Sequence, residues 1–258
     1  MDNEYKTILY RVEDGIATVT LNRPTALNAF DSQMRTDLSK VWQEIEKDDE
    51  VKVSIVTGAG RAFCSGLDLK EASSRERDSQ GAPESEVPFG DIIPSKLTKP
   101  IIAAINGPAA GGGLGLALAC DVAICSEEAV FVAPFAARGL MDAQTVTLLM
   151  KKVPPVWAMW MCLSAERFDA HTARNIGIVK EVLPRDQLMS RADEMAERLT
   201  NHSLDALRAI KEKMLATLYG TVDEAISQIG PMEQTLRNSA ARTEGMSAFA
   251  EKRRPRFN

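Results

Sequence analysis

Short apolar runs bounded by turn residues predict strands in the first 150 residues. These runs cover Ile8–Glu13, Ile16–Leu21, 53–57, Ile101–Ile105, 122–125 and Val130–Val132. Asp14-Gly15 separates the first two runs, and this dipeptide is typical of a tight β-hairpin. One later run, at 178–183, predicts a single strand in the second half of the chain. The pattern therefore predicts a sheet built mainly from the first half of the sequence.

Helical spacing of apolar residues begins between the second and third strands. The recurring positions there are Met34, Leu38, Val41, Trp42 and Ile45. Asp31 or Ser32 is placed to act as the N-cap of this helix. Further helices are expected at 114–119, 143–152, 155–164, 169–175, 187–200, 203–218, 222–238 and 241–252. Strands and helices that alternate in this way, followed by a mainly helical region, are typical of an α/β protein.

The stretch Ile101–Asp121 joins a buried strand to a helix through a glycine-rich turn, Gly111-Gly112-Gly113. A strand that leads through glycines into a helix leaves backbone N–H groups directed at one place. An earlier segment, VSIVTGAGRAFCSG, repeats the order strand, turn, glycine. If the two turns are neighbours in space, their N–H groups could form an oxyanion hole. The same glycines could instead serve only close packing of strand against helix.

Nucleotide-binding loops are excluded by the residues around this turn. Gly113-Leu114-Gly115 begins like a dinucleotide fingerprint, but Leu118 stands where a third small residue is needed. No glycine is followed by Lys-Ser or Lys-Thr, so the chain has no P-loop. The region 71–90 is rich in Ser, Glu, Arg, Pro and Gly and predicts a surface loop, either a lid or an insertion without a function.

Composition narrows the chemistry further. The 258 residues carry a net charge of −5, and no apolar run reaches the ~20 residues of a membrane span, so we expect neither nucleic acid nor membrane as a partner. Four cysteines without a CxxC pair, and an N-terminus without an export signal, suggest a cytoplasmic protein. With only His171 and His202, a histidine-rich metal site is excluded, and acid–base chemistry falls to a carboxylate or to backbone groups.

Five collinear segments resemble the crotonase (enoyl-CoA hydratase/isomerase) superfamily over nearly the full chain. They are VEDGIATVTLNRPTALNAF, VSIVTGAGRAFCSGLDLKE, PIIAAINGPAAGGGLGLALACDVAIC, LSAERFDAHTARNIGIVKEVLP and EGMSAFAEKRRPRF. The resemblance implies a crotonase-type spiral of ββα units at 1–198 and a helical C-terminal trimerisation region at 199–258. It implies a homotrimer or homohexamer. It also implies a coenzyme A thioester as substrate, with no separate cofactor and no metal.

The resemblance also assigns residues to the site. The family's oxyanion donors, both backbone N–H groups, correspond to Leu67 and Gly112. The residues implied in coenzyme A binding are Ala26, Leu27, Ser65, Gly66, Asp68, Leu69 and Lys70, with Phe249 and Lys252 from the C-terminal helix. A cation near the phosphates of coenzyme A is physically sensible, and Arg23 is a further candidate for it alongside Lys70.

Two departures from the family pattern bear on the reaction. Its hydratases use a pair of glutamates, which correspond here to Gly115 and Phe135, and neither of these can move a proton. Asp142 is then the candidate acid, base or nucleophile, although an aspartate at this place can also be a helix N-cap. The resemblance favours isomerase-like chemistry. The alternatives are a catalytically silent acyl-CoA-binding homologue and an enzyme similar to 4-chlorobenzoyl-CoA dehalogenase or to a hydrolase.

Overall fold

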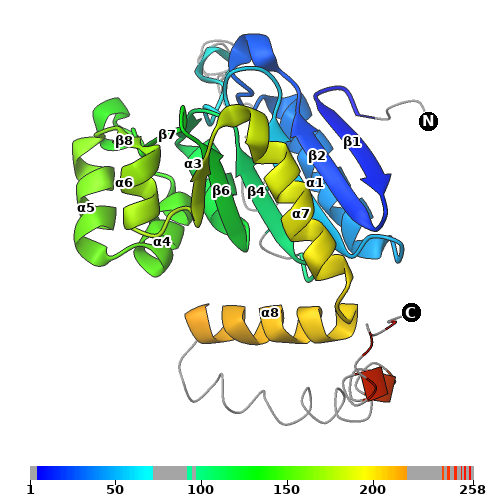
Figure 1. The fold of residues 1–258 in the computed structure, drawn as a ribbon. Coiled ribbons are helices and arrows are strands. Elements are labelled where there is room, and N and C mark those ends of the chain that lie inside the picture. Colours follow the sequence, from blue (N-terminus) through cyan, green and yellow to red (C-terminus); the bar gives the residue numbers. More distant parts are fainter. Residues whose placement is uncertain are drawn as a thin grey trace.

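The computed structural model describes residues 5–71, 92–94 and 97–219, with a few single positions between 240 and 256. The expected helix at 222–238, most of the one at 241–252, nearly all of the expected surface loop at 71–90, and the two residues Phe249 and Lys252 lie outside the described residues. Figure 1 shows the arrangement of the described elements, with a twisted sheet between helices and one long helix beneath it.

Strands within the described residues form two sheets. The bounds are β1 (Ile8–Glu13), β2 (Ile16–Leu21), β3 (Val53–Gly58), β4 (Ile101–Ile105), β5 (Ala109–Ala110), β6 (Val122–Ser126), β7 (Val130–Val132), β8 (Phe168–Asp169) and β9 (Glu181–Leu183). The larger sheet has the order β1-β2-β3-β4-β6-β9, and the smaller has the order β5-β7-β8. From β2 to β9 the neighbours in the larger sheet are parallel. The carboxyl ends of these strands therefore lie at one edge of the sheet.

Helices cover both faces of the larger sheet. The bounds are α1 (Ser32–Lys47), α3 (Gly112–Ala119), α4 (Ala143–Lys152), α5 (Pro155–Ser164), α6 (Ala170–Asn175), α7 (Leu188–Thr200) and α8 (Leu204–Tyr219). Short 3-10 turns occupy Pro24–Ala26, Ala136–Arg138 and Arg185–Gln187. Asp31 caps α1 by accepting a hydrogen bond from the Met34 N–H at 2.8 Å.

Alternate residues of the central strands pack on opposite sides of the sheet, as the strand period of two requires. On β4, Ile102 and Ala104 pack with Leu188, Ala192 and Ala196 of α7. The residues between them belong to the main core, together with the apolar face of α1. All five apolar positions that predicted the first helix are buried. The predicted α/β class is thus confirmed, because the central strands pack against helices on both sides of the sheet.

Several elements differ from the sequence prediction. β5 and β8 have two residues each, too few for a periodic pattern, and they form because each pairs with β7. The expected strand at 178–183 is reduced to β9, since only Glu181, Val182 and Leu183 reach the edge of β6. The expected division between residues 198 and 199 falls in the last turn of α7, and it stays a prediction.

The long helix α8 lies at the amino end of β4, away from the carboxyl edge of the sheet. Lys211 of α8 is buried and forms an ion pair with Asp121 at 2.7 Å. The same ammonium donates to the carbonyl of Lys99 at 2.8 Å, and Asp121 accepts from the Ile101 N–H at the start of β4. Among the helices that the structure describes, none has the length and apolar character needed to cross a bilayer.

Candidate functional site

Two glycine-containing turns follow the neighbouring strands β3 and β4 and lie against each other at the carboxyl edge of the sheet. Backbone pairing joins Cys64 to Ala109 in a parallel bridge. A Cβ atom at Gly107 would lie 2.2 Å from the carbonyl oxygen of Arg61, and one at Gly113 would lie 2.2 Å from that of Cys64. Such approaches exclude any side chain, so these two glycines let the turns touch.

Gly66 brings the first turn to the start of α3. Its φ of +86° lies in the region that glycine adopts without strain. A Cβ atom placed on it would lie 2.7 Å from the carbonyl oxygen of Ala110 and 3.1 Å from the backbone nitrogen of Gly112. The residue after Gly66 is Leu67. The two backbone groups assigned by the resemblance therefore come from turns in direct contact.

The N–H groups of Leu67 and Gly112 donate no hydrogen bond to any described residue. The Phe30 N–H donates to the Gly66 carbonyl at 2.8 Å, and the Asp68 N–H donates to the Phe30 carbonyl at 3.1 Å. In such parallel pairing the intervening residue, Leu67, directs its own N–H to the opposite side. Gly112 is the first residue of α3, where N–H groups are unpaired and the helix dipole is positive.

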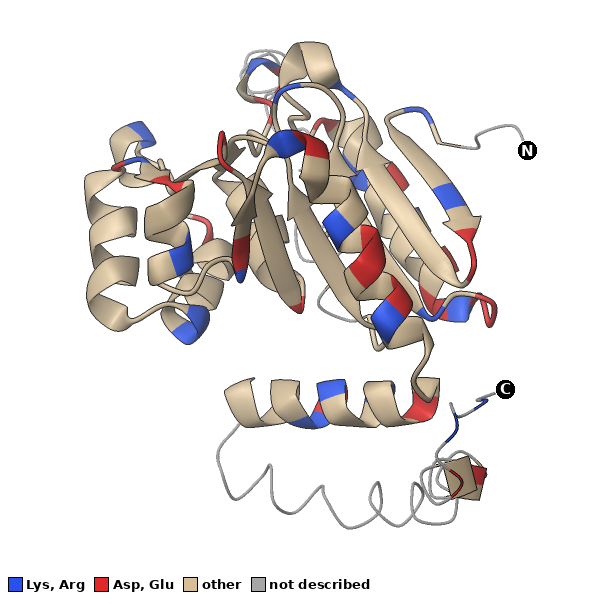
Figure 2. Cartoon of the chain, in the orientation of Figure 1, with Lys and Arg blue, Asp and Glu red and all other residues tan. Residues whose placement is uncertain are grey.

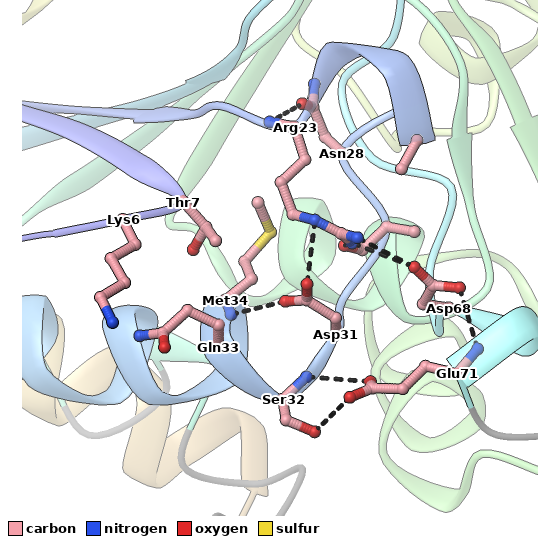
Figure 3. A network of polar contacts seen from close by, with 12 residues as sticks. Lys6, Thr7, Arg23, Asn28, Asp31, Ser32, Gln33, Met34, Asp68 and Glu71 are labelled. Carbon is pink, nitrogen blue, oxygen red and sulfur yellow. Dashed lines mark hydrogen bonds and ion pairs between the residues drawn. The ribbon is translucent and has the colours of Figure 1, made fainter. Parts of the chain in front are cut away.

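A polar network holds Asp68 and Glu71, which follow Leu67 in the chain (Figure 3). The Arg23 guanidinium forms ion pairs with Asp31 at 3.0 Å and with Asp68 at 3.1 Å. Glu71 accepts hydrogen bonds from the N–H and the hydroxyl of Ser32 at 3.0 and 2.8 Å. The network ties the residues after β2, the start of α1 and the segment that follows Leu67 into one unit.

The neighbours of Asp68 in this network determine the pKa of its carboxyl group. Burial acts to raise the pKa of its carboxyl group. Hydrogen bonds from the Glu71 N–H and the Arg23 side chain, together with the Arg23 charge, outweigh burial and hold that pKa below its ordinary value. Arg23 is thus engaged with carboxylates of its own chain, and its expected contact with a phosphate stays a prediction.

Cys64 lies beneath the first turn. Its buried thiol donates to the Asn28 carbonyl at 3.1 Å and accepts from the Gly66 N–H at 3.4 Å. Burial raises the pKa of this thiol to about 12, against which the Gly66 hydrogen bond acts only weakly. Cys64 therefore acts as a neutral support for the turn.

The segments expected to hold coenzyme A are neighbours. The Ser65 N–H donates to the Leu27 carbonyl at 3.0 Å, and its hydroxyl donates to the Ala26 carbonyl at 3.5 Å. The side chains of Leu69 and Lys70, further along the same segment, are exposed. The structure thus brings together the parts of the expected coenzyme A contact that it describes.

Asp142 caps α4, the role that the sequence offered as an alternative to catalysis. Its Oδ1 accepts from the backbone N–H groups of Gln144 at 3.0 Å and Thr145 at 3.2 Å. Its Oδ2 accepts from the Thr145 hydroxyl at 2.8 Å. The carboxylate is half-buried, so it is held by its own helix while it remains accessible.

Thr145 connects Asp142 to the glycine-rich helix α3. A Cβ atom at Gly115 would lie 2.3 Å from the Thr145 hydroxyl oxygen. The Phe135 ring lies against the same glycine-rich turn, with one ring carbon 3.7 Å from a Cβ atom placed on Gly111. Thr145 is not among the site residues that the sequence predicts. The only signal for it was its place three residues after an N-cap aspartate, which does not show what it touches.

The two histidines, His171 and His202, are exposed, on α6 and just after α7. Among the described residues, no three His, Cys, Asp or Glu side chains are grouped so that they could hold a metal ion. The four cysteines are all free.

Comparison with known proteins gives consistent matches over the whole length. The family model described as enoyl-CoA hydratase/isomerase matches residues 11–258. A 1,2-epoxyphenylacetyl-CoA isomerase from Escherichia coli K12 is 34% identical, with 97% of each chain covered. An (E)-benzylidenesuccinyl-CoA hydratase from Thauera aromatica is 33% identical, over 97% of this chain and 98% of that protein. The crystal structure of an enoyl-CoA hydratase/isomerase from Mycobacterium paratuberculosis is 33% identical, covers 99% of both chains and has a TM-score of 0.86.

Proposed function

The chain belongs to the enoyl-CoA hydratase/isomerase family, and from this premise we propose that it is an acyl-CoA isomerase that moves a carbon–carbon double bond. The thioester oxygen would accept hydrogen bonds from the N–H groups of Leu67 and Gly112, and Asp142 would carry the proton. The observation that carries the proposal is the contact between the two turns, with the Cβ position of Gly66 3.1 Å from the Gly112 nitrogen.

The reaction proceeds through an enolate. The Asp142 carboxylate removes a proton from the carbon next to the thioester carbonyl, and the electron pair of that C–H bond passes to the carbonyl oxygen. The two N–H groups and the positive end of α3 stabilise the negative oxygen, and each such donor contributes roughly 10²–10³ in rate. Because the Asp142 carboxyl group is half-buried, its proton can exchange with solvent, and the protonated group then donates to the far carbon of the double bond. The double bond has moved by one position, and no water is consumed.

Gly115 and Phe135 favour isomerisation over hydration. In the hydratase pattern these positions carry the two carboxylates that orient and deprotonate water. Gly115 has no side chain, and the volume beside it is filled by Thr145. Phe135 presents a half-buried apolar ring. Asp142 is thus the one carboxylate of the proposal, which suits a proton carrier that serves both carbons in turn.

The acyl group is expected to be apolar, and aromatic groups belong to the first panel to be tested. Two relatives carry names with aromatic acyl groups, phenylacetyl and benzylidenesuccinyl. In this chain, the Phe135 ring lies beside the glycine turn, and Leu140 and Met141 are exposed immediately before Asp142. Apolar side chains around a polar reacting centre are the usual arrangement for such ligands.

Coenzyme A is expected along Ala26, Leu27 and the segment from Ser65 to Lys70, with Phe249 and Lys252 added from the C-terminal region. It arrives as part of the substrate, so the proposal needs no separate cofactor. The hydrogen bond between Ser65 and the Leu27 carbonyl supports one continuous contact made by the first two segments. Lys252→Ala is expected to weaken binding of coenzyme A, as measured by calorimetry, with Lys213→Ala as a control on α8.

We further infer an assembly of three copies, or of two such trimers, as the family resemblance implies. Apolar side chains left exposed on the described chain support it. On α5 these include Val156, Met159, Trp160 and Leu163, and on α8 they are Ile210 and Met214. Figure 2 shows that α5 carries no charged residue. Light scattering of the purified protein tests the assembly, and a monomer at micromolar concentration would contradict it.

The test of the function uses three forms of the full-length protein: wild type, Asp142→Asn and Asp142→Ala. Asn keeps the cap of α4 but cannot carry the proton, whereas Ala removes both. Incubation of wild type with a panel of unsaturated aliphatic and aryl acyl-CoA thioesters in D₂O should move the double bond and introduce deuterium. Both variants should lose turnover, and Asp142→Asn should keep the stability and the coenzyme A affinity of wild type.

Other outcomes identify the alternatives. Release of free coenzyme A, or of chloride from 4-chlorobenzoyl-CoA, would replace isomerisation by hydrolysis or dehalogenation with Asp142 as nucleophile. Binding of acyl-CoA thioesters without any chemical change would make the chain a silent acyl-CoA-binding homologue. Full activity of Asp142→Asn would overturn the role of Asp142.

A further inference from the structure

We infer that Thr145 is a positioning residue for the Asp142 carboxylate, and that Gly115 is the residue whose missing side chain admits the Thr145 hydroxyl. The inference rests on the proposed function, because it concerns how the proton carrier is held. It adds that the hydroxyl group links α3 and α4 at the point where the family's hydratases carry a glutamate.

The contacts of Asp142 divide between its two oxygens. Oδ1 accepts from two backbone N–H groups, those of Gln144 and Thr145, and this alone completes the helix cap. Oδ2 accepts from the Thr145 hydroxyl at 2.8 Å. Because each oxygen is held from a different direction, the plane of the carboxylate is fixed. A carboxylate oxygen has about two acceptor sites, so Oδ2 keeps one for a proton of the substrate.

Burial keeps the Thr145 hydroxyl hydrogen-bonded to the Asp142 carboxylate. Thr145 has an exposed fraction of 0%, so its hydroxyl cannot turn to bulk water. Without Oδ2 it would be a buried polar group without an acceptor, which is costly. The hydroxyl is therefore held on the carboxylate.

Gly115 supplies the space for this arrangement. A Cβ atom at position 115 would lie 2.3 Å from the Thr145 hydroxyl oxygen and 3.4 Å from the Thr145 Cβ. The first distance is far below van der Waals contact, so the hydroxyl occupies the space where any side chain at 115 would begin. A glutamate at 115 and the Thr145–Asp142 pair are therefore mutually exclusive. In this chain the space is taken by the Thr145 hydroxyl, which contacts the proposed proton carrier.

The experiment compares the proton-transfer step in four single variants, Thr145→Val, Thr145→Ser, Gly115→Ala and Thr145→Ala, and in the double variant Gly115→Ala/Thr145→Ala. Thr145→Val keeps the shape and removes the hydroxyl, so kcat should fall roughly 10- to 100-fold with KM nearly unchanged, as expected for a lost hydrogen bond to a charged group. Thr145→Ser keeps the hydroxyl and should recover most of that loss. Deuterium incorporation into the thioester should fall in parallel with kcat.

Gly115→Ala tests the space directly. The new Cβ atom would displace the hydroxyl, so this variant should show the same loss of kcat as Thr145→Val. Thr145→Ala removes the colliding atom, so the double variant Gly115→Ala/Thr145→Ala should be no slower than Thr145→Ala alone. Such non-additivity is the signature of two residues that act through one contact.

The failure of this inference is distinct from failure of the proposed function. If Asp142→Asn is inactive while Thr145→Val keeps the wild-type kcat and rate of deuterium incorporation, the positioning role is wrong and the function stands. A change confined to thermal stability or KM would likewise overturn it. If Thr145→Val does not fold, additive losses in the Gly115→Ala and Thr145→Ala cycle would overturn it instead. If Asp142→Asn remains active, the proposed function itself fails.

Discussion

The guanidinium of Arg23 meets the carboxylate of Asp68, 45 residues later in the chain, through two nitrogens that each lie 3.1 Å from Oδ2. Asp68 directly follows Leu67, so the pair holds the backbone that directs the Leu67 N–H. The same guanidinium also holds Asp31 at the start of α1. One half-buried cation thus connects the first helix of the chain to the residue that follows one of the two expected oxyanion donors.

Neutralising Asp68 should affect stability and turnover together. Asp68→Asn removes the charge that Arg23 meets, and we expect a loss of about 1 kcal/mol in the free energy of unfolding. It should also lower kcat/KM, because the turn around Leu67 is less firmly held. Asp31→Asn is the matched control, since Asn still caps α1 and the substitution lies on the far side of Arg23. Urea unfolding and steady-state kinetics measure both variants, and equal loss of turnover in the two would contradict the prediction.

The ion pair between Glu181 and Arg191 should make stability depend on acid pH. Hydrogen bonds from Arg191 and Lys180 lower the pKa of Glu181 to about 2 in the folded protein. The unfolded chain then binds more protons than the folded one at acid pH, so stability rises with pH. The contribution of Glu181 is complete above the unfolded pKa of about 4.3 and is lost as pH falls towards 2.

Glu181→Gln tests this dependence. The difference in unfolding free energy between wild type and this variant should be constant from pH 7 to pH 5 and should shrink below pH 4. Glu194→Gln, which loses a single contact with Arg191 at 2.9 Å, should show a smaller difference. A difference that grows as the pH falls would mean that the sign is wrong.

Removing the Gly112 N–H should slow the reaction without removing the helix. Gly112 is the first residue of α3, where proline is tolerated because the N–H has no partner in the helix. Gly112→Pro deletes one oxyanion donor and should lower kcat by roughly 10²–10³. Gly112→Ala keeps the N–H and serves as the control. Equal kcat values for the two variants would exclude the Gly112 N–H as an oxyanion donor.

A side chain at Gly113 should push the two turns apart. Its Cβ atom would lie 2.2 Å from the Cys64 carbonyl oxygen and 2.7 Å from the Cys64 Cβ. Gly113→Ala should therefore lower the free energy of unfolding by about 3 kcal/mol, at the upper end of overpacking effects. Gly139→Ala meets nothing within 4 Å and strains only a φ of +63°, which costs roughly 1 kcal/mol. Thermal unfolding distinguishes the two, and equal shifts would contradict the contact.

Sequence patterns predicted correctly those elements that depend on residues close together in the chain. The hairpin of β1 and β2 has the predicted bounds, because Asp14 and Gly15 adopt the positive φ values that the tight turn needs. α4 begins after Asp142 for a similarly local reason, because the Asp142 side chain accepts a hydrogen bond from the N–H group three residues later. In these places the sequence contains the whole physical cause within a few residues.

Contacts between distant segments could not be predicted in this way. The approach of Thr145 to Gly115 joins residues on two helices, and no periodicity in either helix indicates it. The engagement of Arg23 with Asp31 and Asp68 was hidden for the same reason. The sequence around a basic residue does not show whether its side chain contacts a phosphate or a carboxylate. The fold decides by bringing the carboxylates within 3.1 Å.

The main-chain origin of both expected oxyanion donors has a consequence for evolution and for redesign. N–H groups at positions 67 and 112 survive almost any exchange of side chain that leaves the turns in contact. If the proposed function holds, natural selection can alter the acid–base groups while the stabilisation of the oxyanion is inherited unchanged. Moving the acidic group from α3 to the start of α4 requires few codons, with a glycine at 115, an aspartate at 142 and a threonine at 145. A designer could try the same exchange in reverse.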